Sequence, residues 1–119
     1  MAQSLYERLG GELGLRTMVG EIVDAHRANP VIGPRFKASD VATVKERAFE
    51  FFAAGSGGPQ TYTGLSMPDA HSGMNIDERE FVATCDDVLT VLQAHEIDGA
   101  TQGEVLGIFF ALKPQVLHQ

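Results

Sequence analysis

The sequence predicts an all-α protein, and three observations lead to this fold class. Apolar residues recur at spacings of three and four in several segments, which places them on one face of a helix. Ser, Thr or Asp stands at or near the start of most of these segments, and Gly or Pro follows several of them, as is typical of helix ends. No segment alternates apolar and polar residues as a half-buried strand does. We therefore expect four substantial helices.

The first half of the chain contains two of these helices. Residues 4–8 can form one or two helical turns before a Gly-Gly pair. A first long helix ends at Pro30, and a second one begins after Ser39 or Asp40 and ends at Gly55. The apolar face of the first consists of Leu15, Met18, Val19, Ile22, Val23 and His26, and that of the second of Val41, Val44, Ala48, Phe51 and Phe52.

A loop rich in Gly, Thr and Pro follows the second helix and leads to a short helical turn. Ser66 can cap this turn, which carries Met67 and His71 and ends at Gly73. Loops of this length inside a compact domain are often functional. The short helix is therefore a candidate site.

Two further helices complete the predicted fold. Asp77 and Glu80 have the spacing of a capping box for a helix over about residues 78–95. Thr101 and Glu104 predict a second capping box at the start of the last helix. Pro114 should kink the end of that helix.

Length, charge and cysteine content limit the classes of function. The 119 residues predict a single domain over residues 1–119. The net charge of -7 disfavours nucleic acid as a partner, because phosphate binding needs clustered Lys and Arg. No apolar run approaches the ~18 residues of a membrane span, and no basic, apolar leader opens the chain. The single Cys85 cannot form an internal disulfide, which fits a reducing compartment, so we expect a cytoplasmic protein. The lack of a long apolar run leads us to expect no membrane partner.

The four histidines are the main candidates for chemistry. His95 falls at a predicted helix end and His118 in the C-terminal tail, where both fit ordinary surface positions. His26 fits a partly buried histidine near the end of an apolar helix face. His71 lies on the short helix between apolar Met67 and Ile76, where an imidazole can point edge-on at a cofactor. Spacing alone leaves both an ordinary role and a metal-ligand role open for His71.

Several short blocks of the sequence resemble the truncated haemoglobins, and group 1 of that family most of all. They are LYERLGG at 5–11, FFAA at 51–54, GGP at 57–59, YTG at 62–64 and AHSG at 70–73. Each block alone is a weak signal. The blocks occur in the family's order and at similar separations, so the resemblance covers nearly the whole chain.

The resemblance implies a two-over-two helical sandwich around one haem b, with His71 as the axial ligand of the iron. Phe36 then corresponds to a phenylalanine that stacks on the haem. The other residues that the resemblance places against the haem are Val44, Lys45, Arg47, Ala48, Tyr62, Met67, Ile76 and Phe81. Those expected around a bound gas are Val23, Val44, Ala48, Thr84 and Phe109.

The gas-binding side departs from the family's usual pattern. Most group 1 members carry a phenylalanine and a tyrosine at the positions matching Ile22 and Val23. They also carry a polar residue at one or both of the positions matching Val44 and Ala48. All four residues are apolar here. Thr84 and Cys85 are the nearest polar candidates, so we expect this pocket to lack the family's hydrogen-bond network around oxygen.

These observations support one principal function and leave others open. The principal hypothesis is reversible binding of O2, CO or NO at a five-coordinate iron, for oxygen transport or gas sensing. An alternative is a nitric-oxide dioxygenase or peroxide-handling enzyme, which would need polar groups beside the gas and a reductase as electron donor. Another is a helical interaction module that has lost its cofactor. His26 is also a candidate sixth ligand of the iron.

Overall fold

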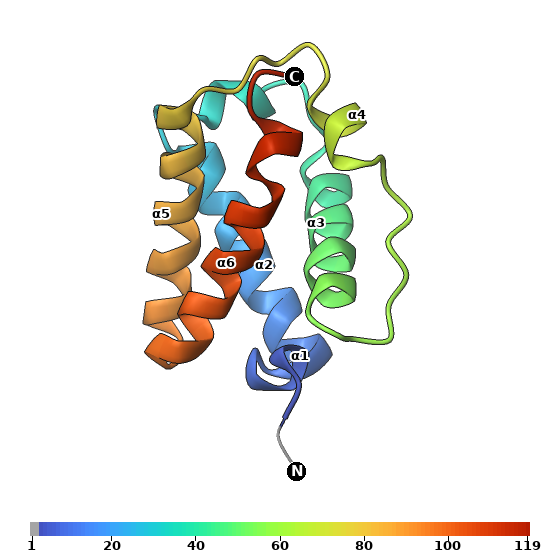
Figure 1. Cartoon of the computed structure of the whole chain (residues 1–119), viewed down its shortest axis with the longest axis vertical. Helices are drawn as coiled ribbons and strands as arrows, with labels where there is room; N and C mark the ends of the chain where they lie inside the picture. Colours follow the sequence, from blue (N-terminus) through green and yellow to red (C-terminus); the bar gives the residue numbers. More distant parts are fainter. Residues whose placement is uncertain (1–2) are drawn as a thin grey trace.

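The computed structural model describes residues 3–119, and all of its regular elements are helices (Figure 1). The order along the chain is α1 (Leu5–Arg8), α2 (Gly11–Ala28), the 3-10 helix η1 (Gly33–Phe36), α3 (Val41–Gly55), α4 (Met67–His71), α5 (Glu78–Ala94) and α6 (Gly99–Val116). Within the described residues, the one β contact is an isolated bridge between Ile76 and Leu117. The predicted all-α class is therefore confirmed.

Two helix pairs form the body of the molecule. α2 packs against α3 along much of its length and also crosses α5, while α6 packs against both α5 and α4. Figure 1 shows α5, α6 and α3 side by side, with α2 passing behind α6. The chain between α3 and α4 has no regular structure and runs along the outside of α3. This arrangement leaves the short α4 facing the space between α3 and α6.

The helix starts were predicted correctly where the capping signal is local. Asp77 and Glu80 form the expected capping box at α5, because each side chain accepts a hydrogen bond from the other residue's backbone N–H. Ser66 caps α4 by accepting the N–H of Asp69 at 3.3 Å. At Gly73 the backbone has φ +80°, which suits a residue without a side chain just after a helix end.

The predicted capping box at Thr101 and Glu104 is wrong. α6 begins earlier, at Gly99, because the Asp98 carboxylate accepts the N–H of Thr101 at 3.0 Å and caps the helix. Thr101 and Glu104 instead bind Arg8, whose guanidinium donates to the Thr101 hydroxyl at 3.2 Å and forms an ion pair with Glu104. Their contacts therefore connect α1 to α6. α6 continues through Pro114 to Val116.

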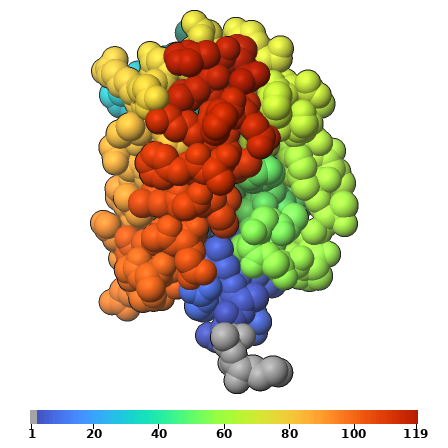
Figure 2. Space-filling view, viewed as in Figure 1, coloured from blue at the N-terminus to red at the C-terminus, as the bar shows by residue number. Residues whose placement is uncertain are grey.

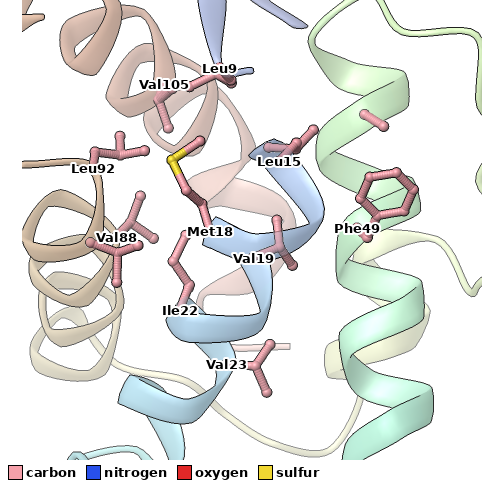
Figure 3. Packing of buried hydrophobic residues seen from close by; sticks show 12 residues of the cluster. Leu9, Leu15, Met18, Val19, Ile22, Val23, Phe49, Val88, Leu92 and Val105 are labelled. Atoms are coloured by element: carbon pink, nitrogen blue, oxygen red, sulfur yellow. The ribbon is translucent and has the colours of Figure 1, made fainter. Parts of the chain in front are cut away.

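The packed core surrounds the N-terminal half of α2 (Figure 3). Leu15, Met18 and Val19 are each at most 2% exposed. Figure 3 shows Val88 and Leu92 of α5 and Val105 of α6 on one side of α2, with Phe49 of α3 on the other. The full cluster is Leu9, Leu15, Met18, Val19, Ile22, Val23, Phe49, Ala53, Val88, Val91, Leu92 and Val105.

The C-terminus is attached to the segment that follows α4. The Asn75 N–H donates to the carbonyl of Gln119 at 3.0 Å, and the His118 N–H donates to the carbonyl of Ile76 at 2.9 Å. These bonds flank the bridge between Ile76 and Leu117. The last residues therefore hold the chain between α4 and α5 in place. No helix in residues 3–119 has both the length and the apolar character needed to cross a membrane.

Candidate functional site

A cavity of about 650 Å³ lies between α2, α3, η1, α4, the start of α5 and α6. This volume falls within the roughly 300–1,000 Å³ typical of small-molecule and cofactor sites. Apolar side chains form most of its wall. In Figure 2 the surface of α3 lies between α6 and the loop that follows α3, at the side of the molecule where the cavity is found. We call this space the main cavity.

His71 lies in the wall of the main cavity, at the C-terminal end of α4. Its Nδ1 is 2.8 Å from the carbonyl oxygen of Met67, one helical turn earlier. A carbonyl oxygen can only accept a hydrogen bond, so this contact assigns the proton of the neutral imidazole to Nδ1. Nε2 then carries the lone pair. This is the usual arrangement of a histidine that binds a metal through one nitrogen and is oriented through the other.

The wall contributed by α2 and α3 is aliphatic. Val23, Val44 and Ala48 all line the main cavity, and Val23 is only 3% exposed. Thr84 of α5 also lines it, but its hydroxyl donates its only hydrogen to the carbonyl of Glu80 at 3.1 Å. Thr84 can therefore accept but not donate towards the cavity. Cys85 is buried but is not one of the lining residues, and burial raises the pKa of its thiol.

A histidine and a phenylalanine stack beside this wall. The rings of His26 and Phe36 are nearly parallel, with centroids 6.1 Å apart, and both side chains line the main cavity. His26 is 9% exposed, and its Nδ1 is 2.8 Å from Oδ2 of Asp87 on α5. Burial lowers the pKa of His26, although the Asp87 carboxylate acts in the opposite direction. The neutral imidazole is therefore favoured.

Charged side chains gather at the edge of the main cavity. The Arg35 guanidinium binds both carboxylate oxygens of Glu80, at 2.8 and 3.0 Å, and this bond lowers the pKa of Glu80. Arg47 lines the cavity with nearly half of its side chain exposed, and lies 3.3 Å from Glu50. The Tyr62 hydroxyl donates to the carbonyl of Leu65 at 2.6 Å, and burial raises its pKa. Of these groups, the half-exposed Arg47 is the cation best placed for an acidic group at the edge of the cavity, because Arg35 is paired with Glu80 and the Tyr62 hydrogen is already donated.

Lys45 differs from the other residues expected around the cofactor. It is not among the side chains that line the main cavity, and its Nζ is 3.0 Å from Oδ1 of Asp24 on α2. The physical reason is the presence of this acidic partner on the neighbouring helix, which the sequence pattern did not reveal. The geometry does not support placing Lys45 beside the cofactor.

The structure brings the remaining sequence-predicted residues together in one place. The side chains that line the main cavity include Val23, Phe36, Val44, Arg47, Ala48, Tyr62, Met67, His71, Ile76, Phe81, Thr84 and Phe109. Their roles towards a cofactor or gas are still predictions. Sequence reasoning missed Arg35 and Glu80, whose pairing joins residues 45 positions apart and leaves no local signal. It considered His26 as a helix-end histidine or a sixth iron ligand, and did not foresee its contact with Asp87.

A second, smaller cavity of about 170 Å³ lies beside the first, between α1, the end of α3 and α6. Its wall is almost entirely apolar. Phe52 and Phe109 line both cavities and pack edge to face, with ring centroids 5.5 Å apart. These two rings therefore stand between the two spaces.

The residues of the main cavity fit a large, flat, mostly apolar cofactor whose metal takes one ligand from the protein. The Nδ1 proton of His71 is held by Met67, so Nε2 is the nitrogen free to bind a metal. The aromatic ring of Phe36 and the aliphatic wall suit the faces of such a cofactor, and Arg47 suits an acidic group at its edge, where Tyr62 also lies. This donor set matches a haem.

Comparison with known proteins gives consistent results. Residues 4–117 match the bacterial-like globin family. The chain is 30% identical to the group 1 truncated hemoglobin GlbN of Mycolicibacterium paratuberculosis over 113 residues, which cover 95% of this chain and 83% of the relative. It is 28% identical to the group 1 truncated hemoglobin of Tetrahymena pyriformis over 102 residues, which cover 86% of this chain and 84% of the relative.

The folds also agree. The crystal structure of the Tetrahymena pyriformis truncated hemoglobin in its Fe(III) form superimposes with a TM-score of 0.95 at 26% identity, covering 98% of this chain and 100% of that one. The match extends through all helices described above, including α4 with His71. On the sequence match, the family match and the common fold, this chain belongs to the group 1 truncated haemoglobins of the bacterial-like globin family.

Proposed function

We propose that the chain binds one haem b in the main cavity, with His71 Nε2 as the axial ligand, and binds O2, CO or NO reversibly at the opposite face. The iron is five-coordinate before the gas arrives. The observation that carries this proposal is the bond between His71 Nδ1 and the Met67 carbonyl, which leaves Nε2 unprotonated in a cavity of about 650 Å³.

The residues of the cavity wall support further proposed roles in haem binding. Phe36 packs on the haem face, while Met67, Ile76 and Phe81 cover the side of His71. Arg47 binds a propionate at the edge of the cavity, and Tyr62 lies near it. Haem supplies the iron on which the gas binds.

The opposite wall determines which gases are held strongly. Val23, Val44 and Ala48 offer no hydrogen-bond donor, and the Thr84 hydroxyl already donates elsewhere. Bound oxygen carries partial negative charge and gains from a donor, whereas bound carbon monoxide is less polar and depends less on one. This site therefore favours carbon monoxide over oxygen more than a site with a tyrosine at position 23. Reversible gas binding, for oxygen transport or sensing, is the function that this wall supports best.

Absorption spectra of the purified protein test haem binding directly. The native protein should bind about one haem per chain and give distinct ferric, ferrous and carbon monoxide spectra. His71→Ala should lose most of its haem or change the ferrous spectrum, because the one proposed protein ligand is gone. His95→Ala is the matched control, since His95 is exposed on the surface and pairs with Glu21. Normal haem content and an unchanged ferrous spectrum in His71→Ala would overturn the assignment.

A further inference from the structure

His26 belongs to a polar cluster that gas binding alone does not require. Its Nδ1 bonds Oδ2 of Asp87, and the Asn29 side-chain amide lies 3.2 Å from each oxygen of the same carboxylate. The Asp87 side chain is 16% exposed and that of His26 is 11% exposed. A His–Asp–Asn cluster is an unusual feature beside an otherwise aliphatic wall, because burying polar groups costs free energy unless they are paired.

The partner of Nδ1 determines the chemistry of Nε2. The Asp87 carboxylate only accepts hydrogen bonds, so Nδ1 carries the proton of the neutral imidazole. Nε2 then has a lone pair, and no residue within 3–119 forms a hydrogen bond with it. An imidazole that is oriented by a carboxylate through one nitrogen and free at the other has the arrangement of a general base.

His26 lies in the wall of the main cavity, whereas Asp87 does not. The two nitrogens of an imidazole point in nearly opposite directions, so with Nδ1 towards Asp87 the edge that carries Nε2 points away from α5. The His26 ring also stacks on Phe36, which lines the same cavity. Asp87 and the stacked ring together fix the orientation of His26.

We infer that His26, positioned by Asp87, accepts a proton from small weakly acidic ligands H–X that enter the main cavity. The H–X bond breaks, its electron pair stays on X, and the proton bonds to Nε2. The products are the anion X⁻, the form that ferric haem binds, and a His26 imidazolium paired with the Asp87 carboxylate. The inference rests on the proposed function, because it needs haem in the cavity. To O2, CO and NO it adds ligands that must lose a proton, such as hydrogen cyanide or hydrogen sulfide.

The surrounding charges are compatible with this role. Asp87 of α5 is the charged group in contact with His26, and its negative charge stabilises the imidazolium. η1 contributes the apolar ring of Phe36 to the contact and carries Arg35, whose charge is paired with Glu80. α3 contributes the aliphatic Val44 to the same cavity wall. His26 is therefore neutral at rest and has one anionic partner when it gains a proton.

The test compares two probes on the ferric, haem-loaded protein at pH 7 by stopped-flow absorption. Hydrogen cyanide holds its proton at this pH and needs a base, whereas azide is already ionised and does not. The variant is His26→Gln, which keeps an N–H for Asp87 but has no basic nitrogen. We expect cyanide association to slow about a hundredfold, at the low end of what a positioned base contributes, while azide association changes less than about twofold. Asp87→Asn should slow cyanide in the same direction by a smaller factor, because it removes the charge that stabilises the imidazolium.

Two controls separate this inference from the proposed function. Carbon monoxide association with the ferrous protein involves no proton, so His26→Gln should change it by less than about twofold, as for azide. His95→Gln, on the surface, should leave all three rates unchanged. Equal slowing of cyanide and azide would mean that the substitution only alters access to the cavity, which overturns the inference. Unchanged cyanide association would overturn it as well. In both cases a normal carbon monoxide spectrum leaves haem and gas binding intact, whereas a protein without haem contradicts the proposed function itself.

A second measurement does not depend on ligand kinetics. In the diamagnetic carbon monoxide form, nitrogen NMR of the imidazole should show His26 protonated at Nδ1 and unprotonated at Nε2. A proton found on Nε2 at neutral pH would remove the lone pair that the inference requires and would overturn it.

Discussion

The two ends of α2 lie in different surroundings, although the apolar pattern is continuous along the helix. Near its start, Leu15 and Met18 are completely enclosed by side chains of the packed core. Near its end, Val23 and His26 are also buried, at 3% and 9% exposed, but they line a cavity of about 650 Å³. Low exposure therefore means different things at the two ends. One end is stabilised by the chain itself, and the other needs a ligand to complete its packing.

Removing haem should change the stability of the protein more than any other test described here. It should destabilise the C-terminal end of α2 more than the N-terminal end. Partly buried apolar side chains such as Phe36 and Val44 would lose their contacts with the haem, at on the order of 1.5–3 kcal/mol for each one fully exposed. Several such losses are comparable to a total free energy of unfolding of about 5–15 kcal/mol. Thermal melts of the apoprotein and the haem-loaded protein measure the difference, and hydrogen exchange locates it. We expect protection to fall at α4 and to persist in the first half of α2.

Equal melting midpoints with and without haem would contradict this comparison. So would a loss of protection that is uniform along α2, because it would mean that the core and the cavity form one cooperative unit.

Two matched valine-to-alanine substitutions test the difference between the packed core and the cavity wall. Val88 is 0% exposed in the core, whereas Val44 is partly buried and faces the main cavity. In the apoprotein, Val88→Ala should lower the free energy of unfolding by about 1–3 kcal/mol, because it opens a void in close-packed surroundings. Val44→Ala should cost under about 1 kcal/mol, because its side chain already borders empty space. Denaturant unfolding measures both values, and equal losses would show that the cavity collapses when haem is absent.

A new hydrogen-bond donor tests the aliphatic wall. Val23→Tyr should slow oxygen release about tenfold or more, because a tenfold change corresponds to ~1.4 kcal/mol and a hydrogen bond to a charged group contributes about 1.5–3 kcal/mol. Carbon monoxide release should change little. Val23→Phe is the matched control, because it adds the ring without the hydroxyl. Stopped-flow release rates decide the matter. Slow oxygen release in the native protein that Val23→Tyr leaves unchanged would reveal a donor that already holds the oxygen.

The smallest expected effect is the pH dependence of the free energy of unfolding. Burial lowers the pKa of His26 below its ordinary value of 6.5, so the unfolded chain binds the proton more readily than the folded one. The stability contributed by neutral His26 is therefore complete above pH 6.5 and is lost as the pH falls through the folded pKa. Thermal melts between pH 7.5 and 5 should show a decline that His26→Gln reduces. An equal decline in both proteins would assign it to other groups, such as Glu80 and Glu50, whose pKa values are lowered.

Local signals in the sequence predicted the fold well. The capping box of Asp77 and Glu80 involves residues three apart and forms in the structure as expected. The same reasoning was wrong at Thr101 and Glu104, because Asp98 supplies a competing cap and Arg8 draws both residues into contacts with α1. A capping pattern predicts only what its own segment favours. Here a neighbouring cap, Asp98, and a distant partner, Arg8, together decide where α6 begins.

The cavity was predictable mainly through the resemblance to a family. Without it, Val44 and Phe81 have the same spacing as core residues, and periodicity does not distinguish a wall around a cofactor from a wall around other side chains. The sequence did not predict the proposed role of His26 as a proton acceptor, for a different reason. Its partner Asp87 is 61 positions away, so only the crossing of α2 and α5 brings the imidazole and the carboxylate together.

The attachment of the C-terminus to the chain after α4 has a consequence for synthesis on the ribosome. The backbone of residues 75–76 finds its partners in residues 117–119, after the whole of α5 and α6. Contacts between distant residues require a long loop to close and tend to form late. The segment next to His71 therefore lacks these bonds until residues 117–119 leave the exit tunnel. We expect a nascent chain to take up haem stably only after these residues have emerged.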